Sequence, residues 1–309
     1  MINNLFVNQY FSNQHFDSRY YTIKLNLILI SILAASGLIL GGSQNSVYIA
    51  SWPLFGLCGV LIFAIQWISF IPSYIYKTEK HFDLVGSLTY IAMAIFVLVN
   101  VNTDDVRSWI IALAVIIWSI RLGTFLFKRI ISTGTDTRFD DIKINFLKLL
   151  MTWTLQGLWI FATFGAGLAA ITSNEESTLG FVDFIGLSLF VIGLTIEIVA
   201  DTQKSNFKKN GAAGFINIGL WKYSRHPNYL GEILIWVGIS ILSITVLSGW
   251  QYITLISPIF VILLLTKISG IPMLEKKSDM KWGHLKEYQN YKSQTPVLIP
   301  NMFNVFSRN

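Results

Sequence analysis

Long apolar runs recur along the whole chain and constrain its fold more than any other feature. Each run is about 20 residues long, the length of an α-helix that crosses the hydrocarbon core of a bilayer. Backbone groups in lipid find partners only within a helix or a closed barrel, so these runs must be helices. The sequence therefore predicts an all-α, polytopic membrane helix bundle. The expected spans are 23–42, 52–75, 84–101, 106–127, 146–171, 181–200, 229–248 and 250–270.

Charges in the connections indicate which way the spans run. With eight spans, one side receives the basic segments "YKTEKHFD", "KRIISTGTDTRFDDIK", "DTQKSNFKKNG" and "WKYSRHPN", together with a lysine-rich tail. The other side receives the acidic or neutral segments "NTDDVR" and "TSNEESTLG". Positive residues mark the cytoplasmic side, so both termini are expected in the cytoplasm. Seven spans is the alternative, if the first run lies in the membrane interface.

Composition limits the other classes of function. Only 13% of residues are charged, and the net charge of +6 is concentrated between the apolar runs. It therefore indicates membrane orientation or an anionic ligand rather than nucleic acid. Cys58 is the single cysteine and the four histidines are scattered, so neither a disulfide nor a metal centre is expected.

Three segments are expected along the chain, with no internal repeat and no linker between separate domains. Residues 1–22 form a cytoplasmic or interfacial segment, and they lack the basic start and cleavage site of a removable signal peptide. Residues 23–270 form the transmembrane bundle with its cytoplasmic loops. Residues 271–309 form a cytoplasmic tail.

Polar side chains gather where the run at 181–200 ends. Glu197 and Asp201 are four residues apart and share one helical face, which Lys204 and Lys208 continue toward water. A charge inside an apolar run costs a few kcal/mol unless it is paired or faces a wet cavity. The segment is either an interfacial ladder of salt bridges or a polar cavity, in which the acids bind hydroxyls and amides and Lys208 meets phosphate.

The stretch "GLWKYSRHPNYLGE" is expected to turn the chain into the next helix. Pro227 forbids a regular helix before it and pushes His226 toward an extended conformation. Asn228 is expected to cap the helix, with Glu232 one turn further on the same face. Arg225 and the free amides of this helix start would make an anion site. The alternatives are a membrane anchor for Arg225 and a packing role for His226.

Several isolated polar groups lie in or beside other spans. Arg121 is about a turn and a half inside its run, where it either snorkels to the surface or meets a ligand. Asp136 and Arg138 follow in a loop, as a local ion pair or as a lid over a ligand. Amides inside spans usually bond a neighbouring helix. The remaining groups of this kind are Gln66, Asp83 and Gln156.

The tail carries aromatic and basic residues at helical spacing. Lys281, His284, Tyr288 and Tyr291 recur every three or four residues, which predicts one helical face that mixes rings with positive charge. Such a face would stack on an adenine and hold a ribose phosphate, or would anchor the tail to anionic lipid.

These motifs resemble those of the membrane steroid 5α-reductase superfamily, in particular its bacterial branch labelled DUF1295. The resemblance rests on "DTQKSNF", "LWKYSRHPNYLGE" and the final "LIP", supported by "WSIRL", "TDTRF" and "KHFDLVGSLTY". It is specific over about residues 118–300, fainter over 66–117, and no recognised motif covers residues 1–60.

The resemblance implies a bundle of seven or more helices that binds NADPH from the cytoplasmic side and reduces an activated C=C bond of a lipophilic enone. Family positions that contact the cofactor match Glu197 and Asp201, a phosphate-binding base matches Lys208, and the asparagine near the nicotinamide amide matches Asn228. The candidate cofactor-binding residues are Arg121, Asp136, Arg138, Glu197, Asp201, Gln203, Lys204, Lys208, Tyr223, Arg225, His226, Asn228, Tyr229, Glu232, Lys276, His284, Tyr288 and Tyr291.

The chain departs from the family at the substrate. Steroid reductases hold the substrate ketone with a tyrosine paired to a glutamate, whereas here Trp118 stands at the tyrosine position and only Gln66 lies near the glutamate. An indole N–H donates a hydrogen bond but cannot act as a general acid. The candidate catalytic residues are therefore Asp83, Tyr90, Trp118, Gln156 and Gln66.

A second family shares the H-P-x-Y and G-x-x-Y-x-x-Y features, namely the isoprenylcysteine carboxyl methyltransferases, which bind S-adenosylmethionine. They usually lack D-x-Q-K-x-x-F and carry an acidic pair where this chain has "EKK", so an NADPH-dependent oxidoreductase is favoured. A transporter or lipid scaffold would need polar groups near the midplane, whereas here they cluster at one face. We expect a monomer in the bacterial inner membrane, with a lipophilic substrate and membrane lipid as its partners.

Overall fold

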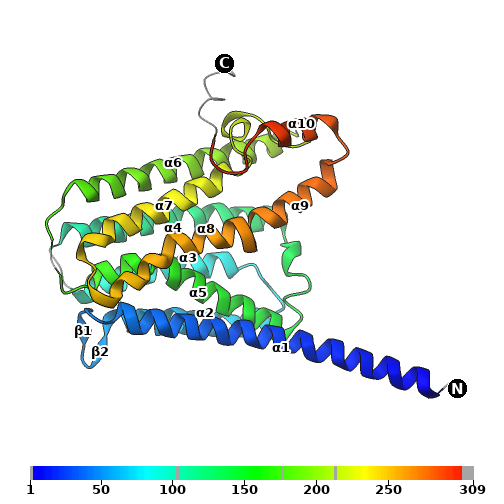
Figure 1. Ribbon diagram of the computed structural model, residues 1–309, viewed down its shortest axis with the longest axis horizontal. Helices are drawn as coiled ribbons and strands as arrows, with labels where there is room; N and C mark the ends of the chain where they lie inside the picture. The colour runs from blue at the N-terminus through cyan, green and yellow to red at the C-terminus, as the bar shows by residue number, and fades with distance from the viewer. Residues whose placement is uncertain (1–2, 102–104, 176, 212–213, 301–309) are drawn as a thin grey trace. The chain divides into compact units, whose positions relative to one another are not determined.

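The computed structural model describes residues 3–101, 105–175, 177–211 and 214–300, and the side chains of these residues from Tyr21 onward. The chain divides into two compact units (Figure 1). Unit 1 comprises residues 1–175 and 248–254, and unit 2 comprises residues 176–247 and 255–309. In the described parts, strand is confined to one short hairpin in unit 1.

Unit 1 is a helix bundle built around α5. This helix packs against α1, α2, α3 and α4, and it is the most deeply buried of the candidate spans. Its second half, "FGAGLAAI", is rich in small residues, which lets neighbouring helices approach closely. The elements are α1 Asn3–Gly42, β1 Tyr48–Ile49, β2 Trp52–Pro53, α2 Leu54–Ile75, α3 Phe82–Val101, α4 Val106–Thr133, the 3-10 turn η1 Thr137–Phe139 and α5 Phe146–Ile171.

Unit 2 is built around the pair α6 and α7. The π-helical segment η5 separates α8 from α9, and a short connection separates α9 from α10. The elements are α6 Phe181–Lys209, η2 Gly219–Lys222, α7 Pro227–Ser243, η3 Ile244–Val246, α8 Ile256–Leu263, η5 Leu264–Ile268, α9 Ile271–Trp282 and α10 Lys286–Gln294. The 3-10 segment η4 Gly249–Leu255 precedes α8 in the chain, and all but its last residue belongs to unit 1.

Four glycines bring α6 and α7 into backbone contact. A Cβ added at Gly186 would lie 2.8 Å from the carbonyl oxygen of Gly238, and one added at Gly193 would lie 2.6 Å from that of Gly231. The glycines are seven residues apart on each helix, so they fall on one face. In lipid, close backbone approach of this kind is a main source of helix association.

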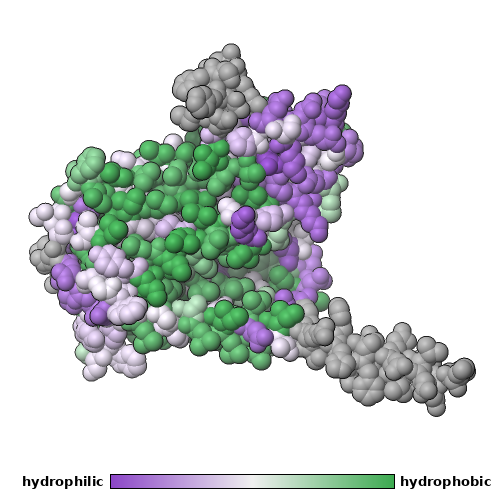
Figure 2. All heavy atoms as spheres, in the orientation of Figure 1, coloured by the Kyte–Doolittle hydropathy of each residue, from purple (hydrophilic) through white to green (hydrophobic). Residues whose placement is uncertain are grey.

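The predicted membrane fold is confirmed. The described residues contain eight helical segments long and apolar enough to cross a membrane. In unit 2, Figure 2 shows apolar side chains over the visible sides of α6, α7 and α8, and polar side chains over α9 and α10.

The predicted ends of some spans need correction. Helices α4 and α6 continue to Thr133 and Lys209, beyond the expected ends at 127 and 200. A helix can continue beyond the lipid until a residue that ends helices is reached. Helix α4 ends at Gly134, which has a φ of 79°. The last expected span, 250–270, is not one regular helix but the sequence η4, α8 and η5.

Candidate functional site

The acidic end of α6 lies directly against the start of α7. Glu197 and Asp201 are 4% and 8% exposed. A Cβ added at Gly231 would lie 2.8 Å from the backbone nitrogen of Glu197. Two motifs far apart in sequence, the acids of α6 and the "NYLGE" segment of α7, therefore meet in unit 2. Asn228, Tyr229 and Glu232 are half-buried in that segment.

Gln203 and Lys204 fix the turn η2 to α6. The Gln203 side-chain oxygen accepts a hydrogen bond from the Leu220 amide at 2.9 Å, and the Trp221 indole donates to the Ala200 carbonyl at 3.1 Å. The Lys204 ammonium lies 4.6 Å from the centre of the Trp221 ring. These candidates for cofactor contact thus hold local structure. Lys208, one turn beyond Lys204, is exposed at the end of α6.

The start of α7 differs from the expectation in one respect. His226, not Asn228, is the N-cap residue, and Pro227 is the first helical residue. Proline suits that position because its missing N–H is one that the helix leaves unpaired anyway, and its fixed φ matches the helix. Asn228 therefore lies inside the first turn, and its side chain makes no cap.

Glu275 on α9 is the partner of the "SRH" turn, and it was not among the sequence candidates. Its carboxylate lies 2.5 Å from Arg225 Nη1 and 2.8 Å from His226 Nε2. Lys292 Nζ lies 3.5 Å from the same group. The His226 ring also stacks on Tyr229, with centroids 5.8 Å apart. The only sequence signal was a single acid before two lysines in "LEKK".

The tail does not form the single helical face that was predicted. Helix α9 ends at Trp282, and α10 begins at Lys286, because the chain turns at Gly283. Lys281 and His284 therefore do not continue the face of Tyr288 and Tyr291. The spacing argument took no account of this break between α9 and α10.

Tyr288 and Tyr291 are engaged within unit 2. The Tyr291 hydroxyl donates to the Trp221 carbonyl at 2.7 Å, and both rings pack on Phe215 with centroids 5.1 and 5.2 Å away. Burial raises the pKa of both phenols, that of Tyr288 to about 12 with help from its bond to Asp279. The candidates Lys276 and His284 are exposed, and Tyr223 is half-buried beside Lys222.

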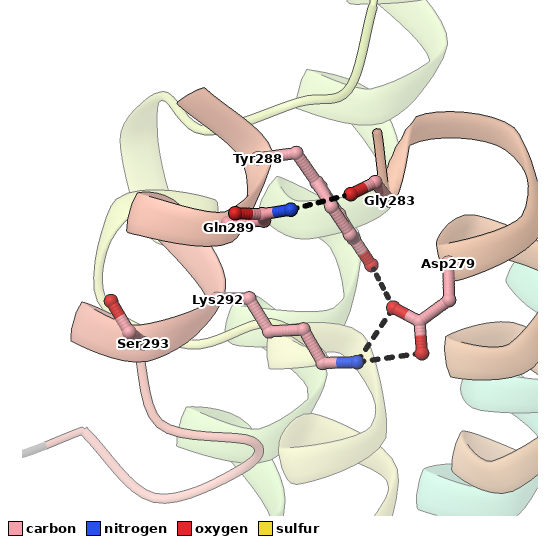
Figure 3. A pocket seen from close by; sticks show the side chains of 6 residues that line it. All are labelled: Asp279, Gly283, Tyr288, Gln289, Lys292 and Ser293. Carbon is pink, nitrogen blue, oxygen red and sulfur yellow. Dashed lines mark hydrogen bonds and ion pairs between the residues drawn. The ribbon is translucent and has the colours of Figure 1, made fainter. Parts of the chain in front are cut away.

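A shallow cavity of about 440 Å³ lies between α9 and α10 (Figure 3). Lys292 Nζ lies 2.6 Å from one oxygen of Asp279, and the Tyr288 hydroxyl donates to the same oxygen at 3.0 Å. The Gln289 amide donates to the Gly283 carbonyl at 2.8 Å. The polar groups that line the cavity thus form hydrogen bonds and ion pairs mostly with one another.

In unit 1, Tyr90 and Trp118 are in contact. Both are buried, at 3% and 1% exposed, and their rings meet edge to face with centroids 5.2 Å apart. The Tyr90 hydroxyl lies 2.5 Å from Thr163 Oγ1. Because Thr163 gives its own proton to the Trp159 carbonyl, Tyr90 is the donor of this bond. Tyr90 is the one strong O–H donor among the five catalytic candidates.

The side chains of Gln66 and Gln156 both donate hydrogen bonds to α3. Gln66 donates to Thr89 Oγ1 at 2.9 Å, and Gln156 donates to the Phe82 carbonyl at 3.0 Å. The Thr89 hydroxyl donates to the Val85 carbonyl, so it can only accept from Gln66. Because Thr89 and the Phe82 carbonyl both accept, the side-chain nitrogens of the two glutamines must face them. Both side-chain oxygens are buried with no hydrogen-bond partner in the described part of the chain.

Charged residues organise the loop between α4 and α5. Asp136 and Arg138 form an ion pair, as one of the two readings expected. The buried carboxylate of Glu79 accepts from the Asp136 amide at 3.0 Å and from Lys143 Nζ at 3.1 Å. The hydrogen bond from Arg138 lowers the pKa of Asp136, against a smaller effect of burial. Glu79 was not predicted to take part.

Asp83 lies close enough to Asp136 and Arg138 of that loop to interact with their charges. Asp83 faces Arg129 at 3.6 Å. Arg121 lies on α4, which continues past the apolar run to Thr133, so its depth of about a turn and a half inside that run stays a prediction. Its guanidinium lies 5.7 Å from the Phe125 ring. Among the described residues, no group of three or more His, Cys, Asp or Glu could hold a metal ion.

Comparisons with known proteins find distant similarity to steroid reductases over part of the chain. A 3-oxo-5-alpha-steroid 4-dehydrogenase 1 of Rattus norvegicus is 27% identical over 117 residues, 37% of this chain and 40% of its own length. A steroid 5-alpha-reductase DET2 of Gossypium hirsutum is 29% identical over 121 residues, 37% of this chain and 44% of its own.

An uncharacterised protein of Schizosaccharomyces pombe is 23% identical over 168 residues, 44% of this chain and 48% of its own. The chain thus matches less than half of the length of each of these relatives. No solved structure matches it. The resemblance to the steroid 5α-reductase superfamily is confirmed by the family model described as "Protein of unknown function (DUF1295)", which matches residues 69–295, so the chain belongs to the DUF1295 family.

Proposed function

We propose that the protein is an integral membrane oxidoreductase that uses NADPH to reduce an activated C=C bond of a lipophilic enone. The observation that carries this proposal is the meeting of Glu197 with the "NYLGE" segment across the glycine contacts of α6 and α7. Both segments match motifs of the steroid 5α-reductases. The likeness to relatives named for steroid reduction supports the same reaction class.

The residues at the α6–α7 contact fit a dinucleotide. Two buried carboxylates, Glu197 and Asp201, are acceptors suited to ribose hydroxyls. The Asn228 amide has the donor and acceptor needed for the nicotinamide carboxamide. Phosphates would be held by Lys208, by Arg225 and by bases of the tail. We further propose that this side faces the cytoplasm, in keeping with the distribution of positive charge.

The chemistry requires one hydride and one proton per enone. When bound, NADPH would supply the hydride to the β-carbon. The chain must stabilise the charge that develops on the carbonyl oxygen, and the Tyr90 hydroxyl is the group suited to donate there once it leaves Thr163. The α-carbon then takes a proton from water to complete the saturated ketone. The substrate would enter from the bilayer, and the protein would act as a monomer.

Purified protein in detergent tests the cofactor directly. We expect NADPH to raise the thermal unfolding temperature and S-adenosylmethionine to leave it unchanged, because a ligand stabilises the state that it binds. The opposite result would favour a methyltransferase of the isoprenylcysteine carboxyl type.

Asn228→Ala tests the assigned site. If Asn228 orients the nicotinamide, this change should lower turnover of an enone such as testosterone more than it weakens NADPH binding. Unchanged turnover would refute the assignment of Asn228.

A further inference from the structure

Glu275 joins three parts of unit 2 through one half-buried carboxylate. One oxygen faces Arg225 Nη1 and Lys292 Nζ, and the other faces His226 Nε2. These bases come from the turn before α7 and from α10, whereas Glu275 itself is on α9. Removing a charged partner from such a cluster leaves uncompensated charge, which is costly.

Residues 295–298 bind the same turn, and we call this segment the strap. The Arg225 amide donates to the Pro296 carbonyl at 3.0 Å, and the Ser224 hydroxyl donates to the Leu298 carbonyl at 2.7 Å. The Thr295 hydroxyl lies 3.4 Å from the Lys222 carbonyl. Hydrogen bonds to main-chain carbonyls fix the path of the turn, and Glu275 fixes the two side chains that the turn presents.

The contacts of Glu275 also decide what those side chains can offer a ligand. A carboxylate facing His226 Nε2 requires a proton on that nitrogen, so the contact with Glu275 fixes the orientation of the imidazole ring. Arg225 uses Nη1 on Glu275, while its Nε has no hydrogen-bond partner among the described residues. The guanidinium is thus oriented and keeps donor capacity.

We propose that Glu275 is a positioning residue that orients Arg225 and His226 for the phosphate-bearing part of the cofactor. This inference rests on the proposed use of NADPH. Glu275 would not touch the cofactor; it would set the angle of the Arg225 guanidinium toward the 2′-phosphate and fix the orientation of the His226 ring beside the ribose. Its loss should therefore affect the discrimination between NADPH and NADH, which differ only in a phosphate.

Asp279 provides a matched control. It lies one turn beyond Glu275 on α9 and also contacts Lys292, but its hydrogen bonds join it to Lys292 and Tyr288 on α10 rather than to the turn before α7. Glu275→Gln and Asp279→Asn each replace one carboxylate by an amide of the same size.

The experiment measures dissociation constants for NADPH and NADH on the full chain in detergent. We expect Glu275→Gln to weaken NADPH binding at least about tenfold, as for the loss of one partner of a desolvated charge pair. NADH binding should change by less than about threefold, and so should NADPH binding to Asp279→Asn. A purely structural role would weaken both nucleotides equally, and that outcome would overturn the proposal.

NADPH binding to the unaltered protein separates this inference from the function on which it rests. Absence of NADPH binding to the unaltered protein would overturn the proposed function and, with it, the assigned role of Glu275. If the unaltered protein binds NADPH and Glu275→Gln keeps its preference over NADH, only the role of Glu275 fails. Unchanged exchange at the Arg225 amide would show that the variant keeps the strap and that the measured loss arises from side-chain orientation.

Discussion

Gly193 on α6 and Gly231 on α7 touch through their backbones, because a Cβ added to either would lie 2.6 Å from the carbonyl oxygen of the other. No side chain fits between the two helices at this level. The contact also sets the position of Glu197, one turn beyond Gly193, against the segment that carries Asn228 and Glu232. The helix packing of unit 2 and its candidate cofactor site therefore depend on the same pair of residues.

Gly193→Ala should destabilise unit 2. The added methyl group must push α6 and α7 apart, and overpacking of this kind costs about 1–3 kcal/mol. Thermal unfolding in detergent should show a lower midpoint and a weaker shift with NADPH. Gly37→Ala is the control, since nothing lies within 4 Å of a Cβ added at this helical position. Equal midpoints for the two variants would contradict the backbone contact.

Tyr90→Phe should abolish most of the turnover of a suitable enone. It removes one hydrogen bond to Thr163, worth about 1 kcal/mol of stability, but also the proposed donor to the substrate carbonyl, which is worth roughly 100-fold or more in rate. Thr163→Val removes the same bond and keeps the phenol, so its turnover should fall much less. Steady-state rates and unfolding midpoints for both variants check this. Equal loss of turnover would reduce Tyr90 to a packing residue.

Loop 134–145 should be held most firmly between about pH 4 and pH 10. The pKa of Asp136 is lowered below its usual value of about 3.9, chiefly by Arg138. Its stabilising contribution is therefore present above that value and lost as pH falls through the folded pKa. For Lys143, burial acts to lower the pKa, but the bonds to Glu79 and Asp140 outweigh it. This contribution is complete below about pH 10.4 and is lost as pH rises through the raised pKa.

Limited proteolysis of this loop across pH measures the window. Asp136→Asn should remove only the change in cleavage rate at acid pH. Lys143→Met should remove only the change in cleavage rate at alkaline pH. A loop whose cleavage rate is constant across pH in the unaltered protein would refute both ion pairs.

Tyr288 should ionise only near pH 12. Burial, assisted by the bond to Asp279, raises its pKa from the ordinary value of 10.0 to about 12. The stability that this phenol contributes is complete below about pH 10 and is lost as pH rises through about 12. Ultraviolet titration of Tyr288→Phe should lack one tyrosine that ionises late. Loss of one that ionises near pH 10 would contradict the buried position.

The sequence predicted the helices well and their ends less well. Apolar runs alone located all eight spans, since no other structure satisfies the backbone in lipid. The ends of α4 and α6 were misplaced, because hydropathy reports where lipid ends rather than where the helix ends. Gly134, with its positive φ, was a readable signal for the end of α4 that the hydropathy argument passed over.

Partners of the charged residues were beyond sequence reasoning. Arg225 was expected either to bind an anion or to anchor the chain in the membrane. In the structure its guanidinium donates to Glu275, fifty residues further along the chain. Glu79 was not a candidate, although it orders the loop that carries Asp136 and Arg138. The value of a charge depends on distances of a few ångströms and on local burial, and spacing along the chain sets neither.

The sequence by itself determined an all-helical membrane protein of the DUF1295 family and the segments that carry its motifs. Tertiary structure decided which of those side chains are still available to a ligand. Lipid imposes helices on any long apolar run, whatever its neighbours, because an unpaired backbone group there costs several kcal/mol. The pairing of Arg225 with Glu275 instead required the turn before α7, α9 and α10 to come together, and only the packing of these elements provides that.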